Sequence, residues 1–262
     1  LEMSGVVCYD VGPEGRKPRQ TKRNPIVLAD AILPTIHFQH PEFNRVLEYL
    51  RGQEVHETLG VFKNLIAKVN GFEFVFGLGG IHGSVKNMRF TSDVNNVILD
   101  IDVTSFYPML AIQNRFYPEH LGLKFCDVYQ SLFDQRTQHA KGTTENAMLK
   151  LALNGVYGDS NNPYSVFYDP LYTMKTTLNG QFLLCMLAER LLGTIGVSII
   201  QINTDGVTLL VNRDSLAQVQ SITTEWEKFT RLSLEQVEYD RMIVADVNNY
   251  IAVGAGGKIK SK

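Results

Sequence analysis

The sequence predicts an α+β protein in which an antiparallel sheet is backed by helices. Strands are indicated by β-branched runs, and helices by stretches in which apolar residues recur at helical spacing. The expected strands cover 72–76, 97–103, 197–211 and 232–253, and the expected helices cover 127–141, 143–157, 174–194 and 215–230. The run at 197–211 contains Asn-Thr-Asp-Gly, a hairpin turn that joins antiparallel strands.

Composition indicates a soluble globular protein of one large or two small domains, with 262 residues of which 44% are hydrophobic and 20% charged. The formal net charge of −2 means that any nucleic-acid surface must be local. Three scattered cysteines, Cys8, Cys126 and Cys185, argue against zinc and disulfides and favour a reducing, cytoplasmic location. No apolar run reaches membrane-spanning length, so we expect no membrane partner.

The N-terminal part is expected to be mostly irregular. Residues 1–34 show little periodicity, and a short helix is predicted after Pro41. The apolar stripe of that helix comprises Phe43, Val46, Leu47 and Leu50. The strand at 72–76 is followed by Gly77-Leu-Gly-Gly-Ile-His-Gly83, whose glycines allow positive φ and close approach of another backbone. This loop is either a plain turn or a path for a sugar-phosphate backbone.

The strand at 97–103 carries the first candidate site. Its alternation places Asp100 and Asp102 on one face and apolar residues on the other. Carboxylates at a strand end suit a hard cation such as Mg²⁺, although an edge strand with solvated acids would have the same pattern. Phe106-Tyr-Pro108 then leads into a short helix that reaches Asn114.

Two further helices carry polar candidates. The helix at 127–141 includes Arg136 at helical spacing, and the next helix is capped by Thr143. On this second helix Lys150, Asn154 and Tyr157 share one face. That face suits a phosphate with a sugar or base, but a solvated polar face would look the same. Residues 165–168 are expected to form a strand.

The hairpin at 197–211 presents Asp205 at its turn, beside Gly206. Turn chemistry alone explains an Asp-Gly pair, so this acid is a candidate only in combination with the others.

In combination, these segments resemble the family B DNA polymerases. Asp102-Val-Thr-Ser-Phe-Tyr-Pro108 matches the first palm motif of that family, Asp-x-x-Ser-x-Tyr-Pro. Lys150-Leu-Ala-Leu-Asn-Gly-Val-Tyr-Gly158 matches its fingers motif, Lys-x-x-x-Asn-x-x-Tyr-Gly, and Asn203-Thr-Asp-Gly206 partly matches Asp-Thr-Asp-Ser. Gly79-Gly80 resembles the paired-glycine loop, and Asn248-Asn-Tyr250 lies where a Lys-Lys-x-Tyr run is expected. The resemblance covers about residues 72–262.

The resemblance implies a polymerase palm with a short helical fingers hairpin. No Asp-x-Glu exonuclease motif lies upstream of residue 100, and the chain stops at Lys262, where a thumb would begin, so we expect neither an exonuclease domain nor a thumb. The expected domains are an N-terminal segment at 1–71, a palm at 72–114 and 159–262, and fingers at 115–158. The chain would be part of a larger viral or mobile-element replicase.

The resemblance also implies template-directed DNA synthesis with two Mg²⁺ ions, or Mn²⁺ as a substitute. Its implied partners are primer-template DNA, deoxynucleoside triphosphates and the remaining domains of a parent polymerase. The implied catalytic acids are Asp102 and Asp205, and the implied metal ligands are these two acids and Val103. The implied nucleotide-binding residues are Ser105, Phe106, Tyr107, Arg136, Lys150 and Asn154, with Tyr107 excluding a 2′-hydroxyl. The implied DNA-binding residues are Gly79, Gly80, Tyr157, Gly158 and Tyr250.

Several positions depart from the family pattern. Asn203 replaces an aspartate, and Asp100 is expected to restore acidic charge near the metals. Asn248 and Asn249 replace lysines, which weakens the expected grip on DNA. Gly206 replaces a serine, which we attribute to the needs of the turn. Two alternatives therefore remain: a noncatalytic nucleic-acid-binding or scaffold domain derived from a polymerase, and a primase or RNA-type polymerase on a similar palm.

Overall fold

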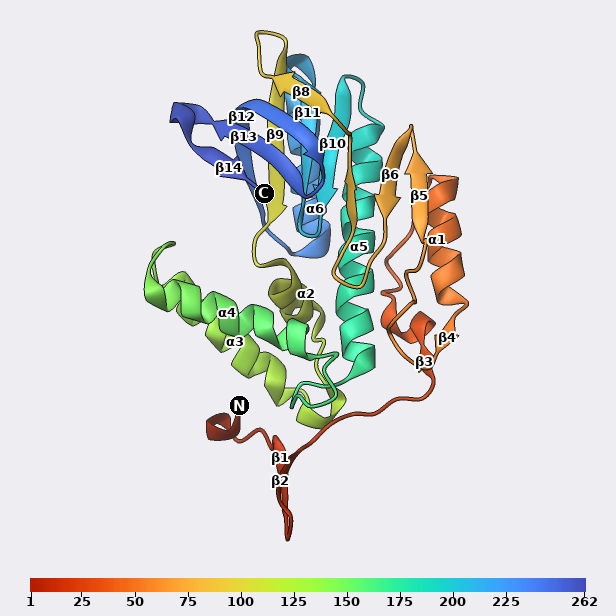
Figure 1. Ribbon diagram of the computed structural model, residues 1–262, viewed down its shortest axis with the longest axis vertical. Coiled ribbons are helices and arrows are strands. Elements are labelled where there is room, and N and C mark those ends of the chain that lie inside the picture. Colours follow the sequence, from red (N-terminus) through yellow and green to blue (C-terminus); the bar gives the residue numbers. More distant parts are fainter. The chain divides into compact units, whose positions relative to one another are not determined.

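The computed structural model describes residues 1–262, with Ala255 described by its backbone alone (Figure 1). Two compact units divide the chain. Unit 1 comprises Leu1–Leu33, Arg51–Val61 and Ser105–Asn179, and unit 2 comprises Pro34–Leu50, Phe62–Thr104 and Gly180–Lys262. These boundaries differ from the expected N-terminal, palm and fingers segments, since residues 105–114 and 159–179 fall in unit 1.

Unit 2 is built on a ten-stranded sheet in which every pair of strands is antiparallel, as the sequence predicted for an α+β protein. The path through the sheet is β14-β13-β12-β9-β11-β10-β7-β6-β5, with β8 paired to β12. The strands are β5 (Ile66–Val69), β6 (Phe72–Val75), β7 (His82–Ser84), β8 (Met88–Thr91), β9 (Asn96–Val103), β10 (Val197–Asn203), β11 (Gly206–Asn212), β12 (Leu234–Asp246), β13 (Asn249–Gly254) and β14 (Ile259–Ser261).

One face of the sheet packs against helices. Leu99 of β9 lines a pocket with Leu216 and Val219 of α6 (Leu216–Thr230), which follows the short η4 (Arg213–Ser215). The buried residues Val97, Leu99, Ile101 and Val103 alternate with the acids, so the apolar half of β9 faces this helix layer. Trp226 Nε1 donates a hydrogen bond to the carbonyl of Leu183, 2.8 Å away, and thereby joins α6 to α5 (Pro170–Leu192).

The predicted helix after Pro41 is α1 (Pro41–Arg51), and all four residues of its expected stripe are buried. The Phe43 ring lies 5.0 Å from that of Phe74 on β6, in an edge-to-face arrangement. The Phe76 ring lies 5.9 Å from that of Phe182 on α5. These aromatic contacts join α1 to β6 and α5 to the residue that follows β6.

A β-bulge near Asp240 separates two parts of β12 that pair with different strands. Residues Leu234–Tyr239 pair with β9 and Arg241–Val244 pair with β8, while the pairing with β13 begins at Tyr239 and continues past the bulge. The β12–β13 hairpin covers the other face of β9 and β10, with Met242, Val244 and Ala252 packed against Ile98. The bulge therefore changes the direction of β12 beside the face that carries Asp100 and Asp102. After β13 the short η5 (Ala255–Gly257) leads to β14.

Unit 1 contains helices, the β1–β2 hairpin and a second two-stranded antiparallel sheet formed by β3 and β4. Its elements are η1 (Glu2–Ser4), β1 (Tyr9–Gly12), β2 (Gly15–Pro18), β3 (Ile26–Val27), η2 (Leu28–Ala31), β4 (Glu54–Val55), α2 (Phe106–Asn114), η3 (Glu119–Leu121), α3 (Lys124–Thr137), α4 (Thr144–Asp159) and the first part of α5. Residues 1–34 were expected to be irregular, which is wrong for β1 and β2, since these pair as a hairpin.

The strand expected at residues 165–168 is also absent, because the backbone there folds back on itself. The amide of Tyr168 donates to the carbonyl of Ser165, 3.2 Å away, and forms a turn. The predicted cap of α4 is confirmed, since the Thr143 side chain accepts a hydrogen bond from the amide of Asn146.

None of the helices among the residues that the structure describes has the length and apolar character needed to cross a membrane.

An ion pair holds the N-terminal arm within unit 1. Arg23 Nε lies 2.8 Å from Asp169 Oδ1, and the side chain of Asp169 is 1% exposed. The amides of Glu119 and Leu171 also donate to Asp169. Hydrogen bonding to Asp169 is the main reason why the pKa of Arg23 is raised.

We expect Arg23→Met to lower the free energy of unfolding by about 3–5 kcal/mol, because it leaves the buried Asp169 carboxylate without its cation. Arg16→Met is the matched control: the pair of Arg16 with Glu2 is about half-exposed, so its loss should cost about 0–1 kcal/mol. Urea denaturation followed by circular dichroism measures both. Equal stabilities of the two variants would contradict the role given to Arg23.

Candidate carboxylate site and nucleotide-binding residues

Asp102 and Asp205 lie at neighbouring strand ends in unit 2. Strand β9 pairs with β11 so that Asp102 is opposite Gly206. Beyond this pair the amide of Val103 donates to the carbonyl of Asp205, 2.7 Å away. Asp102 is partly buried and Asp205 is exposed. The antiparallel register thus brings together two acids that are far apart in the sequence.

Gly206 allows the Asp102 carboxylate to cross the adjacent backbone. A Cβ atom at position 206 would lie 2.0 Å from Asp102 Oδ1 and 2.8 Å from the carbonyl oxygen of Ile101. Gly206 is not among the residues with positive φ, whereas Thr204 in the turn has φ 53°. The expectation that the turn requires this glycine is therefore wrong, and close packing of the carboxylate is the physical reason for it.

Asp100 has a different environment from Asp102. It is buried, and its two oxygens accept hydrogen bonds of 2.6 Å from the hydroxyls of Thr208 and Tyr239. Thr208 is directly opposite Asp100 on β11, and Tyr239 reaches it from β12. Burial and the bond to Asp100 raise the pKa of Tyr239, which therefore stays a donor. Asp100 supplies negative charge, but its oxygens already accept bonds from the protein.

Repulsion among carboxylates affects Asp102 directly. Burial is the largest cause that raises its pKa, to about 6, followed by the negative charge of Asp100 and, more weakly, of Asp205. Lys260 acts in the opposite direction, with its Nζ 3.6 Å from Asp102 Oδ2. The cluster therefore favours any additional positive charge near Asp102.

The glycine-rich loop lies beside the turn that carries Asp205. The amide of Thr204 donates to the carbonyl of Ile81, 2.8 Å away, and its hydroxyl lies 3.1 Å from His82 Nε2. Gly80 has φ 134°, so one expected reason for glycine in this loop is confirmed. A Cβ on Gly83 would lie 2.2 Å from the carbonyl oxygen of Glu73, which confirms the close backbone approach.

Sequence reasoning missed two residues of this site. Glu235 is opposite Asp102 on β12, and Lys260 on β14 contacts both Asp100 and Asp102. Only the register of β12 places Glu235 there, and only the fold of the β13–β14 hairpin places Lys260. Lys260 belongs to the basic run at 258–262, but that run does not indicate a contact with acids, and no motif indicates Glu235.

The expected nucleotide-binding residues all belong to unit 1. Ser105 precedes α2 with φ 50°, a left-handed conformation that costs a serine about 1–3 kcal/mol. Its Oγ accepts a 2.6 Å hydrogen bond from the Arg136 guanidinium, and its carbonyl accepts from the amide of Met109. These bonds hold the backbone at the start of α2, where the implied nucleotide-binding residues Ser105 and Phe106 lie.

Arg136 is also linked to the start of α4. Its Nε lies 3.5 Å from Asn146 Oδ1, and the buried Asn146 side chain donates to the carbonyls of Arg136 and His139. The arginine is thus oriented by residues from α2 and α4. An oriented guanidinium loses little side-chain entropy when it binds a phosphate.

Aromatic rings connect α2 to α4. The Tyr107 ring lies 4.4 Å from the Tyr157 ring and 5.6 Å from the Phe106 ring. Burial raises the pKa of Tyr157, whereas its hydrogen bond with Thr177 lowers it. The other expected residues of α4, Lys150, Asn154 and Gly158, are exposed.

Tyr250 does not fit the expected DNA contact. Its ring is 7% exposed and belongs to the apolar cluster of the β12–β13 hairpin, with Ala252 and Val244. This side chain packs the hairpin and offers almost no surface to a nucleic acid.

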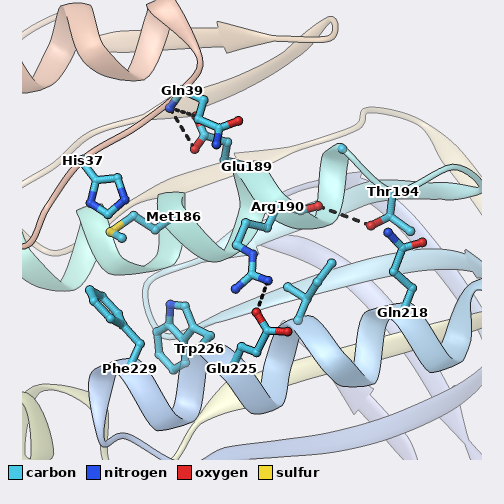
Figure 2. A pocket seen from close by; sticks show the side chains of 12 residues that line it. His37, Gln39, Met186, Glu189, Arg190, Thr194, Gln218, Glu225, Trp226 and Phe229 are labelled. Carbon is cyan, nitrogen blue, oxygen red and sulfur yellow. Dashed lines mark hydrogen bonds and ion pairs between the residues drawn. The ribbon is translucent and has the colours of Figure 1, made fainter.

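The large pocket in unit 2 is not the carboxylate site. It lies between α5 and α6 and has a volume of about 700 Å³ (Figure 2). Its acids already have partners: Glu189 accepts from the amides of Gln39 and His40, and Glu225 pairs with Arg190 at 2.6 Å. Both carboxylates of this pocket are therefore engaged by other groups of the protein.

The chemistry of the donors at Asp102 suits Mg²⁺, which takes oxygen ligands. Within the described residues, no three His, Cys, Asp or Glu side chains group so that they could hold a metal ion. A cation at Asp102 would therefore be held by one or two carboxylates and would take its other ligands from substrate and water, which is usual for Mg²⁺.

No model of a known protein family matches the chain, and no curated protein sequence matches it. Among solved structures the chain is similar to the family B DNA polymerase from the hyperthermophilic archaeon Pyrobaculum calidifontis, with 13% identity and a TM-score of 0.46. The alignment covers 66% of this chain and 27% of the archaeal chain. A likeness of this degree carries no conclusion about activity.

We expect Gly206→Ala to lower the free energy of unfolding by about 1–3 kcal/mol, since the added methyl overlaps the Asp102 carboxylate and the carbonyl of Ile101. Gly79→Ala is the control in the same unit, because a Cβ there has no atom within 4 Å. Thermal denaturation measures both variants. Unchanged stability of the Gly206 variant would show that Asp102 does not need this close approach.

The raised pKa of Asp102 predicts a pH dependence of stability. An acid whose pKa rises on folding stabilises the fold below its unfolded value near 3.8, and this contribution is lost as pH rises through about 6. Asp102→Asn should therefore exceed the wild type in stability by about 1 kcal/mol near pH 8, after allowance for solvent screening, and should match it near pH 4.

Urea denaturation across this pH range measures the difference. Asp93→Asn should change stability in the opposite direction, because hydrogen bonds from the amides of Asn96 and Asn95 lower the pKa of Asp93. That variant should lose stability relative to the wild type above about pH 4. A constant difference between Asp102→Asn and the wild type at all pH values would contradict the prediction.

Proposed function

We propose that this chain is the core of a template-directed DNA polymerase that adds deoxynucleotides to a primer 3′ end by two-metal nucleotidyl transfer. The observation that carries the proposal is the pairing of β9 with β11, because it brings together Asp102 and Asp205, the acids of two sequence motifs. In this proposal the chain belongs to a larger replicase of viral or mobile-element origin and acts with that replicase's remaining domains.

Asp102, Asp205 and the carbonyl of Val103 would hold two Mg²⁺ ions, with Mn²⁺ as a substitute. The bound cations would neutralise charge on the attacking 3′ oxygen and on the leaving pyrophosphate. The support from the structure is the environment of Asp102, in which burial, followed by the negative charges of Asp100 and Asp205, raises its pKa to about 6. An ionised carboxylate in that environment is stabilised by a bound divalent cation.

Arg136 and Lys150 would neutralise the triphosphate, with Asn154 beside them. Arg136 is held by Ser105 and Asn146, and its guanidinium is suited to bidentate contact with phosphate oxygens. The exposed Lys150 would act as a more mobile point charge. The amides of Ser105 and Phe106 at the start of α2 would add donors for the same anion.

Tyr107 would exclude a 2′-hydroxyl and so select deoxynucleotides. This role needs a ring that keeps its position. The contacts of the Tyr107 ring with Phe106 and Tyr157 supply that restraint. Primer-template DNA would contact the backbone at Gly79, Gly80 and Gly158, and Tyr157 would act through Tyr107.

A noncatalytic nucleic-acid-binding or scaffold domain derived from a polymerase is the second candidate. Two observations favour it. Asn203 stands where the family pattern has an acid, and the ammonium of Lys260 contacts the carboxylates of Asp100 and Asp102. These features reduce the negative charge available to a cation.

Primer extension with Mg²⁺ or Mn²⁺ tests the proposal. The wild type should extend a primer, and Asp205→Ala should lower the rate by about 10²-fold or more, since a charge that stabilises the transition state is lost. Asp240→Ala, which removes an exposed acid at the bulge of β12, is the matched control and should keep the wild-type rate. Extension by Asp205→Ala at the wild-type rate would overturn the assignment.

A further inference from the structure

A lysine ammonium lies on the two acids of strand β9. Lys260 Nζ is 3.0 Å from Asp100 Oδ2 and 3.6 Å from Asp102 Oδ2. The Lys260 side chain remains 47% exposed, and that of Asp102 remains 46% exposed. The ammonium is thus shared between a buried carboxylate and one that solvent reaches.

The strand order explains how Lys260 reaches β9. Lys260 is opposite Ala252 in the β13–β14 pair, and directly opposite residues in an antiparallel pair share a face. Ala252 is fully buried and packs in the cluster with Ile98 of β9. Lys260 therefore projects from the face of the hairpin that covers β9, while its neighbours Ile259 and Ser261 belong to the opposite face.

The two acids hold Lys260 unequally. Asp100 is the nearer partner, and it is fixed by hydrogen bonds from Thr208 and Tyr239. Burial would lower the pKa of Lys260, but the charges of Asp100 and Asp102 outweigh it, so the net shift is upward and the amine stays charged. An ammonium that left Asp102 would still have Asp100, its nearer partner.

We propose that Lys260 is an internal counter-ion that competes with a divalent cation for Asp102, so that cation binding requires the ammonium to withdraw from Asp102 toward Asp100. This inference rests on the proposed function, because it takes Asp102 as a ligand of the cation. Two positive charges beside one carboxylate repel each other, and the flexible stem of lysine allows the withdrawal without movement of β14. Lys260 thus sets how tightly the site binds its metal.

Titration of the 262-residue protein with Mn²⁺, followed by electron paramagnetic resonance of the free ion, tests the proposal without any catalytic readout. Lys260→Met should bind Mn²⁺ at least about fivefold more tightly than the wild type near pH 8, because the competing charge is gone. Lys258→Met is the control: it removes an exposed lysine from the same segment and should leave affinity unchanged. Lys260→Gln serves if the methionine variant does not fold.

The outcomes separate this inference from the proposed function. Equal or weaker Mn²⁺ binding by Lys260→Met, with binding retained in the wild type, would overturn the role of Lys260 and leave the metal assignment intact. Absence of Mn²⁺ binding in both proteins would overturn both. If Lys260→Met binds Mn²⁺ more tightly but the wild type extends no primer, the counter-ion role is supported and only the polymerase activity is refuted.

A second measurement follows the ammonium itself. In protein labelled with ¹³C at lysine Cε, the signal that Lys260→Met removes identifies Lys260. Addition of Mg²⁺ should shift this signal in the wild type, and Asp102→Asn should abolish that shift. A signal that does not respond to Mg²⁺ at concentrations where the site is occupied would contradict the withdrawal of Lys260.

Discussion

The antiparallel pairing of β9 with β11 is the constraint on which the candidate site depends. It sets Asp102 opposite Gly206 and the amide of Val103 against the carbonyl of Asp205. A slip of one residue would move Asp100 and Asp102 to the helix-covered face, where Leu99 and Ile101 are now buried. The register is therefore determined by burial of the apolar residues of β9, and the position of the acids is its consequence.

Bringing acids together costs electrostatic free energy, and the structure shows how this cost is reduced. Asp100 is buried but accepts bonds from two hydroxyls and an ammonium, so its charge is compensated within the protein. Asp102 has only a longer contact with Lys260, and burial, followed by the charge of Asp100, raises its pKa. The two acids on this face of β9 thus have different roles. Asp100 is a structural charge, whereas Asp102 is able to exchange its partner.

Several candidate nucleotide-binding residues of unit 1 are also held in position by their neighbours. Ser105 adopts a left-handed backbone conformation, and its hydroxyl accepts a hydrogen bond from Arg136. Asn146 fixes Arg136 in turn, and Tyr157 restrains Tyr107. Strained or tightly restrained residues of this kind are frequent at functional sites, where their positions matter more than local stability. The exposed Lys150 and Asn154 are not restrained in this way.

The sequence by itself determined the helices, the strand pairing class and the face of β9 that carries acids, because periodicity and turn chemistry are local properties. It also indicated Asp102 and Asp205 through their motifs. Only the tertiary structure decided why position 206 is a glycine, that Tyr250 packs in the hairpin and that no strand forms at 165–168. It also decided that Glu235 lies opposite Asp102 and that Lys260 contacts Asp100 and Asp102. These depend on strand register and on how the β12–β13 hairpin folds over β9, and contacts between residues so far apart along the chain leave no periodic pattern in one sequence.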